Sequence, residues 1–308
     1  MSFILNSIKM KKSIFKVLAV VALTAFSSPF LQAQNLTILS GLQGGAYNQL
    51  ANDIKSVSTQ PVDVLTSGGS IENVQKLLEK DGKINCSFVQ FDVLKDEQKK
   101  NPNIKEILKI FQPMLFLEEI HIFTRVDAGI TTMAQLAGKK VAIGSLTQGT
   151  RFTALNIKKG TGIAWEDIDM NSNDAYDALM AGKIDAFFYC GASPIPKFTK
   201  LTPEEQAKLQ LVPLKHKGIP YVYIKQKLAA GTYSFVKEDM DIYSVPTLFM
   251  VRIYPGEIND KVEKLYKDTD EGMRKLMASG HHKAWEVAYE NFRKALLEWP
   301  LYESDPGM

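Results

Sequence analysis

Cysteine and histidine are scarce in this chain, which limits the chemistry that it can hold. Its 308 residues include two cysteines and four histidines, and their spacing matches no metal-ligand set. Cys86 and Cys190 lie in apolar segments, so we expect two free, buried core thiols. A disulfide between them is the alternative in an oxidising compartment. We expect no metal and no cofactor.

Motifs of catalysis and of nucleic-acid binding are missing as well. No Ser/His/Asp order is recognisable, and the loop over 144–150 lacks the Gly-Lys-Ser/Thr of a phosphate-binding loop. The lysines are scattered among acids instead of forming basic runs interleaved with aromatic residues. The sequence therefore argues against an enzyme and against a nucleic-acid partner.

The N-terminal segment contains no acidic residue and has the order of a secretory signal peptide. Four lysines precede an apolar run over 17–26, and small residues that suit cleavage follow at 27–33. We predict a signal peptide over residues 1–33, cleaved near Ala33, with Met10 as an alternative start codon. An uncleaved membrane anchor is the competing interpretation, but the run is short for a membrane span. The predicted location is the periplasm.

Without this leader the chain is nearly neutral and long enough for two lobes. Removing the four leader lysines lowers the formal net charge from +3 to −1, so the basicity of the chain belongs to the leader. The remaining stretch of about 275 residues exceeds the size of most single hydrophobic cores. We therefore expect two lobes.

Three apolar, strand-like runs each end in a loop of Gly, Ser and Thr and continue as a helix-like pattern. These loops cover 40–45, 66–70 and 144–150. In an open α/β sheet such loops lie at the carboxyl ends of the strands, where ligands bind. Glycine admits close backbone approach, and the N–H groups at a helix start favour an anion. Together the loops indicate a receptor for a small anionic solute.

The order of elements is strand, loop and helix along most of the chain, which predicts an α/β fold of doubly wound parallel sheets. Amphipathic stripes such as that of Ala46, Leu50 and Ile54 separate the strands, and the tail over 258–297 has a helical pattern with a break at 279–280. The expected strands are 36–39, 62–65, 84–89, 119–124, 140–143, 184–189, 210–213 and 245–251.

An ordered set of short motifs makes the chain resemble a known family of receptors. The motifs are Gly44-Gly-Ala-Tyr47, Thr66-Ser-Gly-Gly-Ser70 with Asn73, Phe88-Val-Gln90 with Asp92, Leu136-Ala-Gly-Lys-Lys-Val141, Gly149-Thr-Arg151, Gly182-Lys-Ile-Asp-Ala-Phe-Phe188 and Ala230-Gly-Thr-Tyr233, followed by Val245-Pro-Thr-Leu248. In this order they resemble the TAXI-type solute receptors (TRAP-associated extracytoplasmic immunogenic proteins), which serve tripartite ATP-independent (TRAP) transporters. The segment Ser145-Leu-Thr-Gln148 departs from the smaller loop that is usual in that family, and its bulkier residues would reshape the pocket.

The resemblance implies a two-lobed fold like that of type II periplasmic binding proteins, which closes around its ligand on a two-strand hinge. Lobe one would hold residues 34–124 and 245–308, and lobe two would hold 125–244. The implied partners are a small carboxylate ligand and the membrane permease of a TRAP transporter. The receptor is expected to be a monomer.

The residues that we expect to bind the ligand come from the loops of both lobes. The helix starts after Gly69 and Gly149 would face each other across the cleft and favour a carboxylate, such as glutamate or a related dicarboxylate. Lobe one would supply Gly44, Gly45, Tyr47, Ser67, Gly68, Gly69, Ser70 and Gln90, and lobe two would supply Thr147, Gln148, Gly149, Thr150, Arg151 and Tyr189. Ordinary loop or capping chemistry is the alternative for each of them taken alone. Arg151 is either a carboxylate clamp or the partner of a neighbouring acid.

Several other polar residues have a plainer interpretation. We interpret Glu118 and Glu119, beside a crossing strand, as a solvated or hinge ion-pair site. His121 is expected to be a structural residue of a strand, and the adjacent pair of His281 and His282 is not expected to bind metal because neighbours do not share a helix face. The three tryptophans read as packing residues: Trp165, Trp285 and Trp299, the second sharing a stripe with Tyr289 and Phe292.

Two other functions use the same two-lobed architecture. Porphobilinogen deaminase and prephenate dehydratase are enzymes of this kind, and Thr150-Arg151-Phe152 is similar to a motif of the latter, but both are cytoplasmic and the leader argues against them. A ligand-sensing partner of a membrane kinase would share both fold and chemistry with a transport receptor. The loops carry little side-chain signature, so the sequence does not name the solute.

Overall fold

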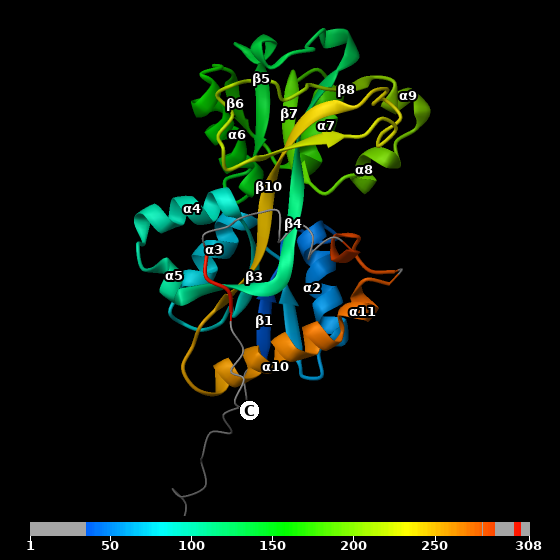
Figure 1. Ribbon diagram of the computed structural model, residues 1–308. Helices are drawn as coiled ribbons and strands as arrows, with labels where there is room; N and C mark the ends of the chain where they lie inside the picture. Colours follow the sequence, from blue (N-terminus) through cyan, green and yellow to red (C-terminus); the bar gives the residue numbers. More distant parts are fainter. Residues whose placement is uncertain (1–34, 279, 287–298, 303–308) are drawn as a thin grey trace, which may run out of the picture. The chain divides into compact units, whose positions relative to one another are not determined.

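The computed structural model describes residues 35–278, 280–286 and 299–302, without the side chains of 112–115 (Figure 1). Within these residues no helix is both long and apolar enough to cross a membrane. The strands are β1 Leu36–Leu39, β2 Val62–Leu65, β3 Cys86–Gln90, β4 Leu108–Arg125, β5 Lys140–Gly144, β6 Glu166–Asp169, β7 Ala186–Gly191, β8 Leu209–Leu211, β9 Ile224–Leu228 and β10 Met240–Arg252. The helices are α2 Ala46–Val57, α3 Ser70–Leu78, α4 Phe91–Lys100, α5 Ile104–Ile107, α6 Gly149–Thr161, α7 Ser172–Met180, α8 Pro196–Thr199, α9 Pro203–Gln206, α10 Glu257–Glu271 and α11 Met273–Leu276, with 3-10 turns at Val126–Ala128 and Met133–Leu136.

The strands form one sheet in the order β2-β1-β3-β10-β4-β7-β5-β6, to which β8 and β9 add at the sides of β4 and β10. We call β2, β1 and β3 with the Arg252 end of β10 the first half, and β7, β5 and β6 with the Arg125 end of β4 the second half. Within each half the outer three strands are parallel, as predicted. Helices cover both faces, so the fold is α/β and doubly wound (Figure 1).

The two central strands correct the expectation of purely parallel sheets. β10 runs antiparallel to both β3 and β4, and β4 runs antiparallel to β7. β4 gains β7 as a neighbour from Glu119 onward, and β10 exchanges β9 for β3 between Ser244 and Thr247. The halves are therefore joined by one antiparallel pair of long strands that belongs to both. The sequence predicted only part of each strand, 119–124 of β4 and 245–251 of β10.

All the predicted strands are present, but two further strands were missed. β6 reads Glu-Asp-Ile-Asp and is mostly exposed, and β9 reads Ile-Lys-Gln-Lys-Leu with alternating exposure. Both lie at a margin of the sheet, where one flank is open to water and charged side chains are tolerated. β6 and β9 were missed because strands were predicted from runs of apolar residues, and these two strands are mostly polar.

Each face of each half carries its own hydrophobic cluster, and helical spacing explains which residues enter it. Leu50, Ala51 and Ile54 of α2 pack with α10 and α11 on one face of the first half, whereas Val74 and Leu77 of α3 pack on the other with α4 and α5. In the second half α6 covers one face and α7 and α8 cover the opposite face.

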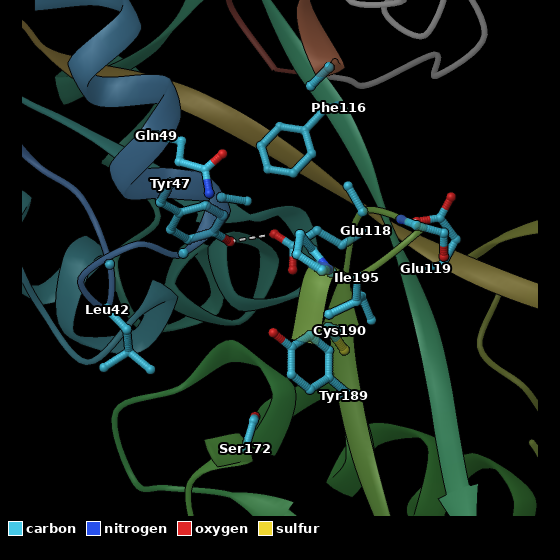
Figure 2. Close-up of a pocket in the computed structure, with 18 of the residues that line it drawn as sticks. Leu42, Tyr47, Gln49, Phe116, Glu118, Glu119, Ser172, Tyr189, Cys190 and Ile195 are labelled. Atoms are coloured by element: carbon cyan, nitrogen blue, oxygen red, sulfur yellow. Dashed lines mark hydrogen bonds between the residues drawn. The ribbon is translucent and has the colours of Figure 1, made fainter. Parts of the chain in front are cut away.

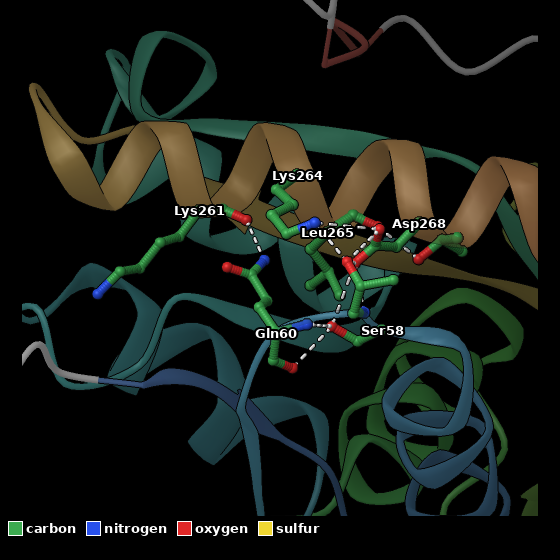
Figure 3. Close-up of polar contacts among 8 residues, drawn as sticks. Ser58, Gln60, Lys261, Lys264, Leu265 and Asp268 are labelled. Carbon is green, nitrogen blue, oxygen red and sulfur yellow. Dashed lines mark hydrogen bonds and ion pairs between the residues drawn. The ribbon is translucent and has the colours of Figure 1, made fainter.

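The tail returns to the first half. The Asp268 carboxylate of α10 accepts hydrogen bonds from the Thr59 N–H at 2.6 Å and the Thr59 hydroxyl at 2.8 Å, in the turn after α2 (Figure 3). Gln60 donates to the Lys261 carbonyl at 2.6 Å in the same view. Beyond residue 286 the predicted helical pattern, with Tyr289 and Phe292, lies outside the described residues, as does the predicted signal peptide.

The tryptophans and cysteines behave as packing residues. Trp165, Trp285 and Trp299 are at most 5% exposed and each belongs to a hydrophobic cluster, as expected. Cys86 is buried and Cys190 is half-buried, and both are free thiols. Burial raises the pKa of both.

Candidate functional site

A cavity of about 1070 Å³ lies where the two halves of the sheet meet (Figure 2). Its wall includes the segments that follow the carboxyl ends of the parallel strands in both halves, which is where the sequence placed a ligand site. Residues 41–47 follow β1, 68–70 follow β2, and Gln90 ends β3; 148–150 follow β5, 172–173 follow β6, and 189–191 end β7. The volume suits a small-molecule ligand.

Most of the sequence-predicted site residues line this cavity. They are Gly44, Gly45, Tyr47, Gly68, Gly69, Ser70, Gln90, Gln148, Gly149, Thr150 and Tyr189. Burial raises the pKa of the Tyr189 phenol to about 12, so it is a neutral donor in the wall.

Ser67, Thr147 and Arg151 are absent from the wall and have structural partners instead. The Ser67 hydroxyl lies 2.5 Å from Asn73 Oδ1 and holds the loop before α3. The Thr147 carbonyl accepts the backbone N–H groups of Ile71 and Glu72 at 3.2 and 3.5 Å. Arg151 forms an ion pair with Asp169 of β6. Of the two orientations considered for this arginine, the structure has the one that faces a neighbouring acid.

The contact at Thr147 corrects the expected geometry of the helix starts. The N-terminus of α3 does not face that of α6 across an open cleft, because the Thr147 carbonyl covers it. Gly69, with a φ of +132°, adopts a backbone conformation that favours glycine at this contact, and a Cβ on Gly149 would lie 1.8 Å from Gln90 Oε1. The two halves therefore touch directly along these loops.

Two helices of more than ten residues, α2 and α6, have first residues that line the cavity and no side-chain cap. Gly45 precedes α2 and Gln148 precedes α6, and neither makes a side-chain capping hydrogen bond. Both helices are long enough for the partial positive charge of an N-terminus to act on an anion. α2 thus replaces α3 in the predicted pair.

The floor of the cavity is a hydrogen-bonded network around Glu118 of β4, which is 5% exposed (Figure 2). Tyr47 donates to its Oε1 at 2.6 Å, Thr247 donates to the same oxygen at 2.7 Å, and Gln90 Nε2 donates to Oε2 at 2.9 Å. Ser70 Oγ lies 2.9 Å from the Tyr47 hydroxyl and accepts the Gln90 N–H at 3.1 Å. The network is built by residues of the first half alone.

Glu118 overturns the interpretation of a solvated or ion-paired carboxylate pair. It is buried, and no lysine, arginine or histidine of the described chain forms an ion pair with it. Burial raises the pKa of Glu118, and the hydrogen bonds from Thr247, Tyr47 and Gln90 oppose that shift. The signal available in the sequence was its position directly after the apolar residues 114–117.

Glu119, on the opposite side of the strand, also lines the cavity. Its carboxylate accepts the Ser193 N–H at 2.9 Å, and burial raises its pKa to about 7. His121 Nδ1 lies 3.0 Å from the Glu119 carbonyl, and its Nε2 lies 3.0 Å from Ser193 Oγ. Burial lowers the pKa of His121 to about 4, so this histidine is the neutral structural residue that the sequence predicted.

Three lysines also contribute to the wall of the cavity. Lys197, Lys200 and Lys283 line the cavity from α8, its C-terminal flank and the tail. His281 pairs with Asp53 at 2.9 Å, and His282 donates its backbone N–H to the same carboxylate. Among the residues that the structure describes, no group of His, Cys, Asp and Glu is placed to hold a metal ion.

The family model of the NMT1-like family matches residues 38–303, and the chain belongs to that family. Among similar solved structures is a TctC solute-binding protein from Polaromonas, with 16% identity, a TM-score of 0.46, and coverage of 84% of this chain and 88% of that one. The periplasmic VFT2 domain of BvgS from Bordetella pertussis has 11% identity, a TM-score of 0.47 and coverage of 85% and 94%. An ancestral arginine-binding protein bound to glutamine has 17% identity, a TM-score of 0.45 and coverage of 84% and 97%.

Proposed function

We propose that this protein is an extracytoplasmic solute receptor that captures a small carboxylate between two lobes and delivers it to a TRAP-type membrane permease. The lobes are residues 34–124 with 245–308, and residues 125–244. The proposal includes export by the predicted signal peptide and membership of the TAXI type. Glutamate, a related amino acid or a dicarboxylate is the proposed ligand class.

One observation carries the proposal: segments from both halves of the sheet enclose one cavity at the carboxyl ends of their strands. This is the position at which open α/β sheets bind ligands. Because the halves share only β4 and β10 as continuous strands, rotation about this pair would open and close the cavity with little change inside either half.

The preference for an anion rests on the positively charged parts of the wall, which also contains Glu118, Glu119 and Glu286. The uncapped starts of α2 and α6 open on the cavity, and Lys197, Lys200 and Lys283 add full positive charge. A carboxylate bound by such groups gains charge-assisted hydrogen bonds.

The ligand class is tested by thermal shifts on the purified protein after its ligand has been stripped. Amino acids, dicarboxylates, neutral sugars and polyamines form the panel. A carboxylate at about a hundred times its Kd stabilises the fold by roughly 2.7 kcal/mol, which moves the Tm by several degrees at this chain length. An increase in Tm with a sugar or a polyamine, and none with any carboxylate, would contradict the proposal.

Closure and delivery need separate measurements. Small-angle scattering should give a smaller radius of gyration at saturating ligand, and an unchanged radius would contradict closure. Uptake of the ligand by vesicles that contain a TRAP-type permease should require the receptor. Regulation of a neighbouring membrane kinase, with no uptake, would instead identify a sensor.

A further inference from the structure

The floor of the cavity presents a negative charge that the described protein leaves uncompensated. Glu118 is buried and receives three hydrogen bonds, but its three neighbours are neutral side chains: Tyr47, Gln90 and Thr247. A buried carboxylate without a cation is costly, and a positively charged partner removes much of that cost.

A second, independent observation lies beside it. Gln90 is 2% exposed, and its Oε1 is buried without a hydrogen-bond partner. The amide orientation follows from its neighbour, because an ionised carboxylate only accepts and Nε2 must therefore face Glu118. Gln90 Oε1 therefore points to the contact between the two halves, where Gly149 covers it. A buried acceptor of this kind lacks a donor.

We infer that Glu118 binds the ammonium group of the ligand, and that Gln90 Oε1 joins it once the loop of Gly149 moves off this atom, so that the solute is an α-amino acid and not a dicarboxylate or keto acid. An ammonium has three N–H donors, which suits two acceptors that belong to neighbouring side chains. The inference rests on the proposed function, because it names the chemistry of one end of the proposed carboxylate ligand.

The remainder of the wall is complementary to such a ligand. Glu118 places a carboxylate at β4, whereas Lys197, Lys200 and the uncapped starts of α2 and α6 are positive. A solute with an ammonium at one end and a carboxylate at the other matches both regions. A dicarboxylate would place one of its anionic ends near the buried Glu118.

An alternative protonation state makes the opposite prediction. If Glu118 were a neutral acid, its O–H would donate to a flipped Gln90 amide, and the group pointing to Gly149 would be a donor. The site would then favour an acceptor on the ligand, and glutamine at position 118 would reproduce it. The variant Glu118→Gln therefore separates the two states.

The test is calorimetric titration of the stripped protein with matched ligands that differ only at the amino group. The pairs are glutamate with glutarate, aspartate with succinate, and alanine with propionate, and α-ketoglutarate is added as the keto analogue. We expect the wild-type protein to bind the amino acid of the best pair about tenfold to a hundredfold more tightly than its amine-free partner. Glu118→Gln should remove most of that preference, chiefly through loss of amino acid affinity.

The matched control is Glu263→Gln. Glu263 is also 5% exposed and accepts a hydrogen bond from a tyrosine hydroxyl, that of Tyr302 at 2.8 Å, but it is not part of the cavity wall and, unlike Glu118, has an ion-pair partner, Lys267, at 3.4 Å. This variant should retain the preference for the amino acid. A loss in both variants would show a general effect of neutralising a buried carboxylate and would overturn the role of Glu118.

The wild-type measurements alone can overturn the inference, even if Glu118→Gln does not fold. Equal or tighter binding of the amine-free ligand would refute the ammonium site and leave the carboxylate receptor intact. Failure of every carboxylate to bind would refute the proposed function itself. Retention of the full preference in folded Glu118→Gln would place the ammonium elsewhere.

Discussion

Two buried carboxylates, Glu118 and Asp92, lie in regions that both join the halves of the sheet, yet they are held in different ways. Asp92 of α4 is 3% exposed and, like Glu118, receives three hydrogen bonds. Its donors are Thr153 Oγ1 at 2.7 Å, Tyr223 OH at 2.9 Å and the Val93 N–H at 2.8 Å. Burial raises the pKa of Asp92 to about 6.

The difference lies in where the donors come from. Both side-chain donors of Asp92 belong to segments that pack with the second half, whereas all three donors of Glu118 belong to the first. If the cleft opens, Glu118 retains its neighbours but Asp92 exchanges its side-chain donors for water. The comparison shows that burial and the number of hydrogen bonds do not identify a binding residue. The origin of the donors, and an unpaired acceptor nearby, distinguish the two regions.

The largest effect is expected at the Asp92 contact. Thr153→Val removes the hydroxyl but keeps the shape, and leaves a buried carboxylate short of a donor. We expect the free energy of unfolding to fall by about 3 kcal/mol, measured by urea denaturation. The control is Thr161→Val on the same helix, whose hydroxyl donates to the Ile157 carbonyl one turn earlier, and which should cost much less. Equal losses in the two variants would show that the contact between the halves adds nothing.

A second substitution tests whether the halves touch in solution along the cavity. The Cβ of Gly149→Ala would lie 1.8 Å from Gln90 Oε1 and 3.0 Å from Ser70 Cβ. We expect a destabilisation of about 2 kcal/mol from overpacking. In a Gln90→Ala background the same change should cost much less, because the Gln90 atoms at 1.8 and 2.5 Å are gone and the contact with Ser70 Cβ at 3.0 Å remains. A negligible cost in the wild-type background would mean that the halves are apart there.

The contribution of Asp92 to the pH dependence of stability can be measured by comparing the wild-type protein with Asp92→Asn. The pKa of Asp92 is raised from 3.8 to about 6 in the folded state, so below 3.8 its full stabilising contribution is present, and this is lost as pH rises through 6. Between pH 7 and pH 5 wild-type protein should gain about 1 kcal/mol relative to Asp92→Asn. Denaturation curves of both proteins at the two pH values give the difference. If the free energy of unfolding changed equally in both proteins between the two pH values, the raised pKa of Asp92 would be contradicted.

The smallest effect is expected at the Glu118 network. Tyr47→Phe removes one of three donors but keeps the ring, which stacks on Phe88 with a centroid distance of 5.4 Å. Because Glu118 lines a cavity, water can replace the phenol, and the cost should be about 0.5 kcal/mol. A loss as large as that of Thr153→Val would show that the two carboxylates are held alike.

Much of the fold and of the wall of the site could be predicted, because both depend on patterns of a few consecutive residues. The strand and loop segments near Gly44, Ser70, Gln90 and Gly149 each carry their signal within a few residues. Glu118 and the covering of α3 by Thr147 could not be predicted in this way. Each depends on contacts between residues far apart in the chain, and the burial of a polar residue is decided by those contacts.

The position of β10 in the middle of the sheet has a consequence for the order of folding. β3 can complete its ladder only with residues 247–251, which are synthesised long after residues 86–90. Until then one edge of β3 is unpaired in the growing chain, although all residues of this strand are buried in the folded protein. Unpaired edges of apolar strands associate with other chains. Pairing at such a large sequence separation is intrinsically slow. The strand pair that links the halves in the finished protein therefore leaves this edge open to association in the nascent chain until residues 247–251 have been made.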